Sequence, residues 1–246
     1  MKAAATLTAL ALIFTAMPAA AQGPAPAITA AVADDARPAP DRERDVHRKP
    51  AEIVAFAGVK PGDIVAEMLP GGGYYTRILS KAVGPTGKVY ALVPAAFASR
   101  PGGLDAINAI AAQYGNIEVV TTDLTKFTLP EPADVVWTTE NYHDFHNGPT
   151  ANIAGVNGSA FAALKPGGLY FIEDHAAKAG TGITATSTLH RIDPAAAISE
   201  ATAAGFTLDG KSNVLANPAD PKDVGVRDPA VKGETEKFAL RFKKPG

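Results

Sequence analysis

The sequence predicts an α/β fold in which helices cover both faces of one doubly wound sheet. Five short apolar runs lack polar alternation, as do strands that are buried on both faces of a parallel sheet. Segments with helical periodicity separate these runs. The last two strand-like segments alternate apolar with polar residues and have no helix between them, which indicates an antiparallel pair. We therefore expect five parallel strands plus an antiparallel closing pair.

The first 40 residues are expected to lie outside this fold. Lys2 precedes an apolar run over residues 3–17, and Ala19-Ala20-Ala21 supplies small residues for cleavage. This pattern is typical of a secretory signal peptide over residues 1–21. We therefore expect an exported protein, which would be periplasmic in a Gram-negative bacterium and free of the membrane after cleavage. Residues 22–40 are rich in Ala and Pro and predict a flexible lead-in, so that the folded domain spans residues 41–246.

In the first half of this domain, apolar runs alternate with segments whose apolar residues recur every three or four positions. The expected strands cover residues 64–66, 89–93 and 117–121. The expected helices cover residues 51–57, 75–83 and 104–111. Gly58 and Pro61 end the first helix, and the glycines at 71–73 open the second.

The second half continues the alternation and then changes character. The expected strands cover residues 134–137, 169–172, 206–209 and 237–243, and the expected helices cover residues 153–164 and 194–204. Asp193 is predicted to cap the last helix, with Pro194 at its first position. Residues 216–235 form a long connection between the closing strands, and connections of this length are uncommon unless they are functional or disordered. We expect this connection to lie over the ligand pocket.

Composition narrows the function classes. The formal net charge is −2, and 20% of the residues are charged, so no basic excess predicts binding to nucleic acid. The chain has no cysteine, which excludes disulfides, thiolate metal sites and a cysteine nucleophile. The expected partner is a small-molecule substrate, and no feature of the sequence predicts an oligomeric state.

A glycine-rich turn, Gly71-Gly72-Gly73, stands between the first strand and its helix. In this position, small residues let backbone amides and a helix N-terminus come close to a ligand. A tight turn without a ligand would favour the same residues, so both interpretations remain open.

Four motifs resemble the class I S-adenosylmethionine-dependent methyltransferases, and within them a bacterial family of exported predicted methyltransferases. They are Pro-Gly-Gly-Gly-Tyr-Tyr-Thr at 70–76, Asn-Tyr-His-Asp at 141–144, Leu-Lys-Pro-Gly-Gly at 164–168 and Leu-His-Arg-Ile-Asp at 189–193. The resemblance covers nearly all of the expected domain. It implies a Rossmann-like fold with S-adenosylmethionine as cofactor.

The resemblance also implies which residues hold the cofactor. They are Glu67, Gly71, Gly72, Gly73, Tyr74 and Asp123. Asp123 could equally be a turn or cap residue. Two positions depart from the family pattern: Leu69 stands where the first glycine belongs, and Val93 stands where an acid usually binds the ribose. Two hydrogen bonds to a charged acceptor, each contributing about 1.5–3 kcal/mol, would be missing at Val93.

Four of the five histidines, with several acids, follow predicted strands on the rim where open α/β sheets bind ligands. They are His143, His146, His175 and His190. In one interpretation, His143 or His175 is a general base, while Asn141 and Tyr142 line the pocket. In a second, His143 and His146 bind a metal with Asp174 or His175, although we assign no metal ligand. In a third, these side chains are structural.

These observations predict methyl transfer from S-adenosylmethionine to an unidentified small molecule. The alternative is a non-catalytic exported protein that binds a ligand or metal on a degenerate methyltransferase scaffold, because a fold does not fix a function. A dinucleotide oxidoreductase is disfavoured, since the turn lacks Gly-x-Gly-x-x-Gly spacing.

Overall fold

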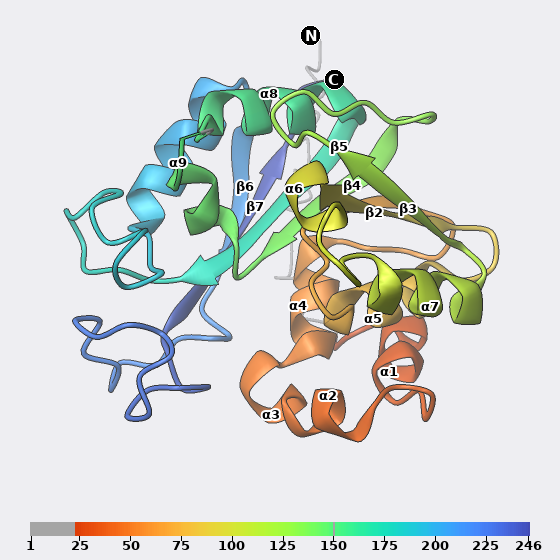
Figure 1. Cartoon of the computed structure of the whole chain (residues 1–246), viewed down its shortest axis with the longest axis horizontal. Coiled ribbons are helices and arrows are strands. Elements are labelled where there is room, and N and C mark those ends of the chain that lie inside the picture. Colours follow the sequence, from red (N-terminus) through yellow and green to blue (C-terminus); the bar gives the residue numbers. More distant parts are fainter. Residues whose placement is uncertain (1–22, 150) are drawn as a thin grey trace, which may run out of the picture.

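A computed structural model describes residues 23–149 and 151–246, and these form a seven-stranded sheet with helices on both faces (Figure 1). The strand order is β3-β2-β1-β4-β5-β7-β6. The strands are β1 Ile64–Met68, β2 Lys88–Pro94, β3 Ile117–Thr122, β4 Ala133–Thr139, β5 Leu164–His175, β6 Thr207–Ser212 and β7 Lys237–Lys243. Neighbours among β1–β5 pair in parallel. The predicted doubly wound sheet is confirmed.

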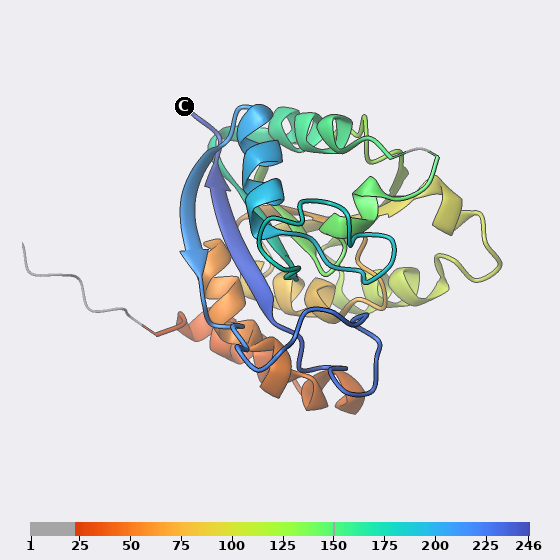
Figure 2. The ribbon, with the colours of Figure 1, turned by 90° about the vertical axis from the view of Figure 1, so that its left-hand side faces the viewer.

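The closing pair is antiparallel, as expected, and its order adds a detail. β7 lies between β5 and β6 and runs antiparallel to both. Figure 2 shows β6 and β7 side by side at one edge of the sheet. Six of the seven described strands therefore run in the same direction, and their carboxyl ends meet at one rim.

Different helices cover the two faces of the sheet. They are α1 Pro26–Val32, α2 Ala39–Glu43, α3 Asp45–Arg48, α4 Pro50–Ala57, α5 Tyr74–Val83, α6 Ala95–Ala98, α7 Asp105–Tyr114, the 3-10 helix η1 Tyr142–His146, α8 Ile153–Ala163 and α9 Pro194–Ala203. Buried residues of α1, α4 and α5 pack on one face, and those of α8 and α9 pack on the other (Figure 1). None of the helices among the described residues is both long and apolar enough to span a bilayer.

The segment expected to be a flexible lead-in is largely folded. Residues 26–32 form α1, with Pro26 at its start, and bury Ile28 and Ala31 against α5. Arg37 is 2% exposed, and its guanidinium holds both carboxylate oxygens of Asp45 at 2.7 and 2.8 Å. The folded part therefore begins well before residue 41. The predicted signal peptide, residues 1–21, lies outside the described residues.

A helix boundary and a loop position also differ from expectation. Leu164, expected on the face of a helix, begins β5, because its backbone pairs with Ala133 at the start of β4. The connection 213–236 does not lie over the large cavity described below, since none of its residues lines that cavity. It packs on the segment after β5, where Asp220 pairs with Arg191 at 2.7 Å and both side chains are fully buried.

Candidate functional site

A cavity of about 1180 Å³ opens at the carboxyl ends of β1, β2 and β4. Its walls come from the glycine turn, from α6 and the start of α7, from the turn after β3, and from η1. Pockets for small molecules commonly occupy about 300–1,000 Å³, so there is room for a large ligand and a second, smaller one. Its location is the rim where open α/β sheets bind their ligands.

The glycine turn presents free backbone donors to this cavity. Gly71 and Gly72 line the cavity, and among the described residues their amides donate to no acceptor. A Cβ built on Gly72 meets nothing within 4 Å. Gly73 lies behind them and begins α5 with a φ of 79°, which favours glycine. The turn is therefore open to a ligand, as the ligand-binding interpretation requires.

Leu69, which stands where the family pattern has its first glycine, adopts a backbone conformation that favours glycine. Leu69 has a φ of 55°, a left-handed conformation that costs a non-glycine residue roughly 1–2 kcal/mol. Asn141 holds this turn from η1, because its Nδ2 donates to the carbonyls of Met68 and Leu69, each at 3.3 Å. Asn141 lines the cavity as predicted, and its amide is occupied in shaping the β1 turn.

Glu67 is the acid next to the end of β1, and it lines the cavity. It is 2% exposed and accepts a hydrogen bond of 2.6 Å from the Thr76 hydroxyl. Burial raises the pKa of this carboxyl to about 7, although the bond from Thr76 opposes the rise. The carboxyl can therefore hold or release a proton near neutral pH beside a bound ligand.

The cavity wall after β2 is apolar, as expected from Val93 at the position where an acid usually lies. Val93 to Phe97 line the cavity without a carboxylate, and Val93 packs with Ile107 and Ile110 of α7. Asp123 also lines the cavity, but one of its oxygens accepts from the amide and hydroxyl of Thr125 at 3.0 and 2.8 Å. Asp123 is therefore a turn residue, which was the alternative to a cofactor-binding role, and it also lines the cavity.

A network of charged side chains forms another part of the cavity wall. Glu140, which lines the cavity, accepts from Lys237 at 2.8 Å and pairs with Arg48 of α3. Burial alone would raise the pKa of Glu140, but Lys237 and Arg48 hold that pKa well below its usual range. Glu140 also has a φ of 54°, and such strain in a non-glycine residue gathers at functional sites.

Tyr74 joins this wall to the glycine turn. It lines the cavity and donates from its hydroxyl to Asp45 at 2.5 Å. The guanidinium groups of Arg44 and Arg48 lie 5.1 and 4.5 Å from its ring centre, within the range of a cation–π contact. Arg44 and Arg48 themselves line the cavity.

The contribution of α2 and α3 was not predicted, because residues 41–49 were interpreted only as the start of the domain. Asp41, Arg44 and Arg48 from this stretch all line the cavity. The signal was present: seven of its nine residues are charged, far above the 20% of the whole chain. A dense run of both signs at a domain entrance was a reason to expect a polar wall.

His143 lies just behind the cavity, and Asp174 fixes its ring. Its Nδ1 is 2.8 and 3.0 Å from the two oxygens of Asp174, which is fully buried. Burial pulls the pKa of His143 down, but the Asp174 carboxylate more than offsets this and the pKa is raised. Nε2 faces away from Asp174, 3.2 Å from Nδ1 of His190.

The other predicted catalytic residues are placed differently. His175 does not line the cavity; its Nδ1 is 2.8 Å from the Thr235 hydroxyl, and burial lowers its pKa to about 4. Tyr142 is also outside the cavity, and its hydroxyl donates to Glu200 at 3.0 Å. These positions do not support a base at His175 or a pocket role for Tyr142. The structure brings His143 and His190 together and leaves His146, bonded to Glu200 at 2.9 Å, apart.

Comparisons with known proteins bear on the fold. No family model and no curated protein matches the chain. The S-adenosylmethionine-dependent methyltransferase from Aquifex aeolicus matches at 18% identity and a TM-score of 0.56, over 78% of this chain and 87% of that one. The glycopeptide N-methyltransferase MtfA, solved with S-adenosylmethionine, matches at 14% and 0.55, over 79% and 86%. The cyclase SpnF matches at 15% and 0.57, over 89% and 91%.

At these identities the likeness shows the fold alone. The chain has the class I fold of the S-adenosylmethionine-dependent methyltransferases, as the sequence motifs predicted. One similar structure is named a cyclase, so the reaction must be argued from the site.

Proposed function

We propose that the protein binds S-adenosylmethionine in this cavity and transfers its methyl group to a small-molecule acceptor. One observation carries the proposal: the amides of Gly71 and Gly72 face the cavity with no acceptor among the described residues. Unpaired backbone donors at the start of a helix suit an anionic or polar ligand group. The fold shared with structures that use this cofactor supports the assignment.

The chain's own residues would divide the cavity into two parts. The glycine turn and Glu67 would hold the amino-acid end of the cofactor, while the apolar wall at Val93–Phe97 and the Asp123 turn would enclose its nucleoside. When bound, the cofactor would supply a methyl group on a positively charged sulfur. An acceptor lone pair would attack the methyl carbon, and S-adenosylhomocysteine would be the leaving group. The charged wall of Arg48 and Glu140 would then face the acceptor and align it.

Titration calorimetry with S-adenosylhomocysteine and S-adenosylmethionine tests the proposal. Gly72→Leu should weaken binding by at least about 10-fold, since its side chain would enter the space that the ligand needs. Gly158→Leu is a matched control, because a Cβ there also meets nothing within 4 Å and Gly158 does not line the cavity. No heat at millimolar ligand, or equal affinity for the Gly72 variant and the control, would reject the proposal.

The second candidate is a non-catalytic binding protein on the same scaffold, and Val93 favours it. A carboxylate at the end of β2 is absent, so two hydrogen bonds to ribose, each of about 1.5–3 kcal/mol, are missing. If S-adenosylhomocysteine binds to the Val93→Asp variant and not to the unaltered protein, this second candidate is correct. If the unaltered protein binds it directly, the carboxylate is dispensable for cofactor binding and this argument for the second candidate falls.

We propose further that the protein acts outside the cytoplasm, on the evidence of Lys2, the apolar run and Ala19–Ala21. N-terminal sequencing of the protein recovered from cell fractions tests this. A mature chain beginning at Gln22 in the exported fraction supports export, and an intact Met1 in the cytoplasm contradicts it.

A further inference from the structure

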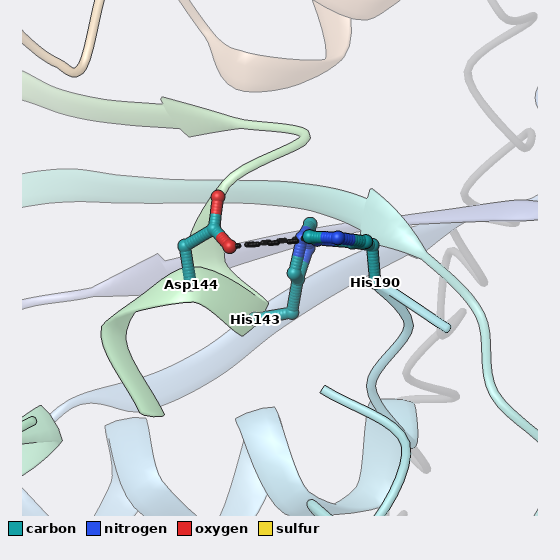
Figure 3. Close-up of side chains that lie close together, drawn as sticks. All are labelled: His143, Asp144 and His190. Atoms are coloured by element: carbon teal, nitrogen blue, oxygen red, sulfur yellow. Dashed lines mark hydrogen bonds and ion pairs between the residues drawn. The ribbon is translucent and has the colours of Figure 1, made fainter. Parts of the chain in front are cut away.

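Three side chains bring potential metal ligands close together (Figure 3), and one of them, Asp144, lines the cavity. His143 and Asp144 come from η1, and His190 comes from the segment after β5. Nε2 of His143 lies 3.2 Å from Nδ1 of His190 and 3.4 Å from Oδ1 of Asp144, and the last two atoms are 3.6 Å apart. The three atoms form a nearly equilateral triangle.

The size of this triangle fits a small tetrahedral ion. Zn²⁺ binds nitrogen and oxygen at about 2.0–2.2 Å, so two ligands of a tetrahedral site stand about 3.3–3.6 Å apart. An octahedral Mg²⁺ with ligands at about 2.0–2.1 Å would need neighbouring ligands only about 2.8–3.0 Å apart. The observed separations of 3.2–3.6 Å match the tetrahedral case.

Asp174 gives His143 the tautomer that a metal needs. The amides of His143 and His175 each donate to this carboxylate at 2.7 Å, and His143 Nδ1 also faces it. A carboxylate only accepts, so Nδ1 carries a proton, which leaves Nε2 as the nitrogen that can bind a metal at the triangle. A carboxylate behind a ligating histidine is the usual support of a zinc site.

His190 is held in place at the expense of backbone strain. Its φ is 54°, a conformation that non-glycine residues adopt rarely and most often at functional sites. The next residue, Arg191, is fully buried and bonded to Asp220 of the 213–236 connection. This anchor fixes the turn that presents the imidazole of His190, and that side chain remains 33% exposed.

We propose that His143, Asp144 and His190 bind one Zn²⁺ ion, with the fourth position left for water or a ligand oxygen. Two histidines, one carboxylate and an open position form a donor set that zinc accepts. Asp144 also lines the large cavity, so the ion lies at the cavity wall. An oxygen of a molecule bound in the acceptor part of the cavity is the ligand class that such a position takes.

Metal titration of the purified protein tests this proposal without any cofactor. After chelator treatment and dialysis, calorimetry with ZnCl₂ should show one Zn²⁺ per chain. His190→Ala should abolish this binding, and Asp174→Asn should weaken it about 10- to 100-fold, since it removes the support behind His143. His47→Ala is the matched control, because His47 pairs with Glu234 away from the triangle. It should bind Zn²⁺ unchanged.

A second readout tests the coordination geometry of the site. Co²⁺ replacing Zn²⁺ should give the strong visible absorption of a four-coordinate site in the unaltered protein and not in His190→Ala. Absence of stoichiometric Zn²⁺ binding in the unaltered protein, or equal binding by His190→Ala, would overturn the proposal. His190→Ala should still bind S-adenosylhomocysteine, so the outcome here is separate from that of the proposed cofactor site.

Discussion

Glu67 should make the stability of the folded protein depend on pH. Its carboxyl has a pKa of about 7 in the folded chain against 4.5 for an ordinary glutamate. Because the folded pKa is raised, the folded state keeps a proton that the unfolded state releases, and stability falls as pH rises through this interval. A difference of about 2.5 pKa units corresponds to about 3 kcal/mol. The loss should be confined to the range between pH 4.5 and about 7.

Glu67→Gln removes this dependence. Urea unfolding of both proteins at several pH values between about 4 and 8 should show a free-energy difference that changes by about 3 kcal/mol in the interval and is flat outside it. Other titrating groups cancel in the difference. Thr76→Val removes the hydrogen bond that opposes the rise in the pKa of Glu67. The pH range over which this variant loses stability should therefore extend to higher pH. Parallel curves for the unaltered protein and Glu67→Gln would show that burial does not neutralise this carboxyl.

The same group connects stability to the proposed cofactor. With a pKa of about 7, a fraction of the Glu67 carboxyls carries a proton near neutral pH, so a cation bound beside it should displace part of a proton per chain. Calorimetry in buffers of different ionisation heat measures that release. The cation that the proposed arrangement places beside Glu67 is the ammonium of the amino-acid end, which both ligands carry. S-adenosylhomocysteine should therefore release a similar fraction of a proton, and the Glu67→Gln variant should release none. Absence of proton release by either ligand would place the ammonium away from Glu67.

Three further changes have expected outcomes. Asp220→Ala leaves the guanidinium of Arg191 buried without its partner, which should cost about 3–5 kcal/mol and lower Tm by roughly 6–20 °C in calorimetry. Gly73→Ala would overlap Ile110 at a φ of 79° and should cost about 1–3 kcal/mol in urea unfolding. Tyr142→Phe breaks buried hydrogen bonds and should cost about 1–3 kcal/mol, with affinity for S-adenosylhomocysteine unchanged.

Each of these changes has a control or a contradicting result. Asp223→Ala breaks an exposed pair with Lys178 and should cost no more than about 1 kcal/mol; equal losses for both aspartates would contradict the role of burial. Gly73→Ala combined with Ile110→Ala should recover only the steric part of the loss, since the backbone strain remains. Weaker ligand binding by Tyr142→Phe would mean that Tyr142 acts on the cavity after all.

The sheet was predictable because its signals are local. Val89 and Val135 lie in short apolar runs of the kind that form strands buried on both faces. Leu164 was misplaced because the glycines after it resemble a helix end, whereas pairing with β4 carries the strand back to that residue. The hydrophobic periodicity of the sequence does not reveal pairing between strands that are far apart in the chain. The helix α1 was missed for a related reason: its seven residues bury only Ile28 and Ala31.

The candidate site was predictable in outline and not in its contacts. The glycine turn and Glu67 lie where the motifs placed them, because a turn after the first strand has one position in this fold. The hydrogen-bond partners of the histidines could not be predicted from the sequence, because η1 directs His143 toward Asp174 and His146 toward Glu200. The metal set weighed from spacing contained His146, whereas the triangle contains His190. A tight helical turn sets such directions, and the sequence carried no signal for it.

The central place of β7 constrains the order in which the molecule can be made. Both β5 and β6 pair with β7, residues 237–243. Until β7 has been synthesised, β5 therefore lacks one of its two neighbours and β6 lacks its neighbour in the sheet. Until then β5, rich in apolar side chains, exposes unpaired amides and carbonyls that invite association with other chains. A chaperone that covers this nascent edge, and proteases that remove chains interrupted before Lys237, should therefore affect the yield of this protein.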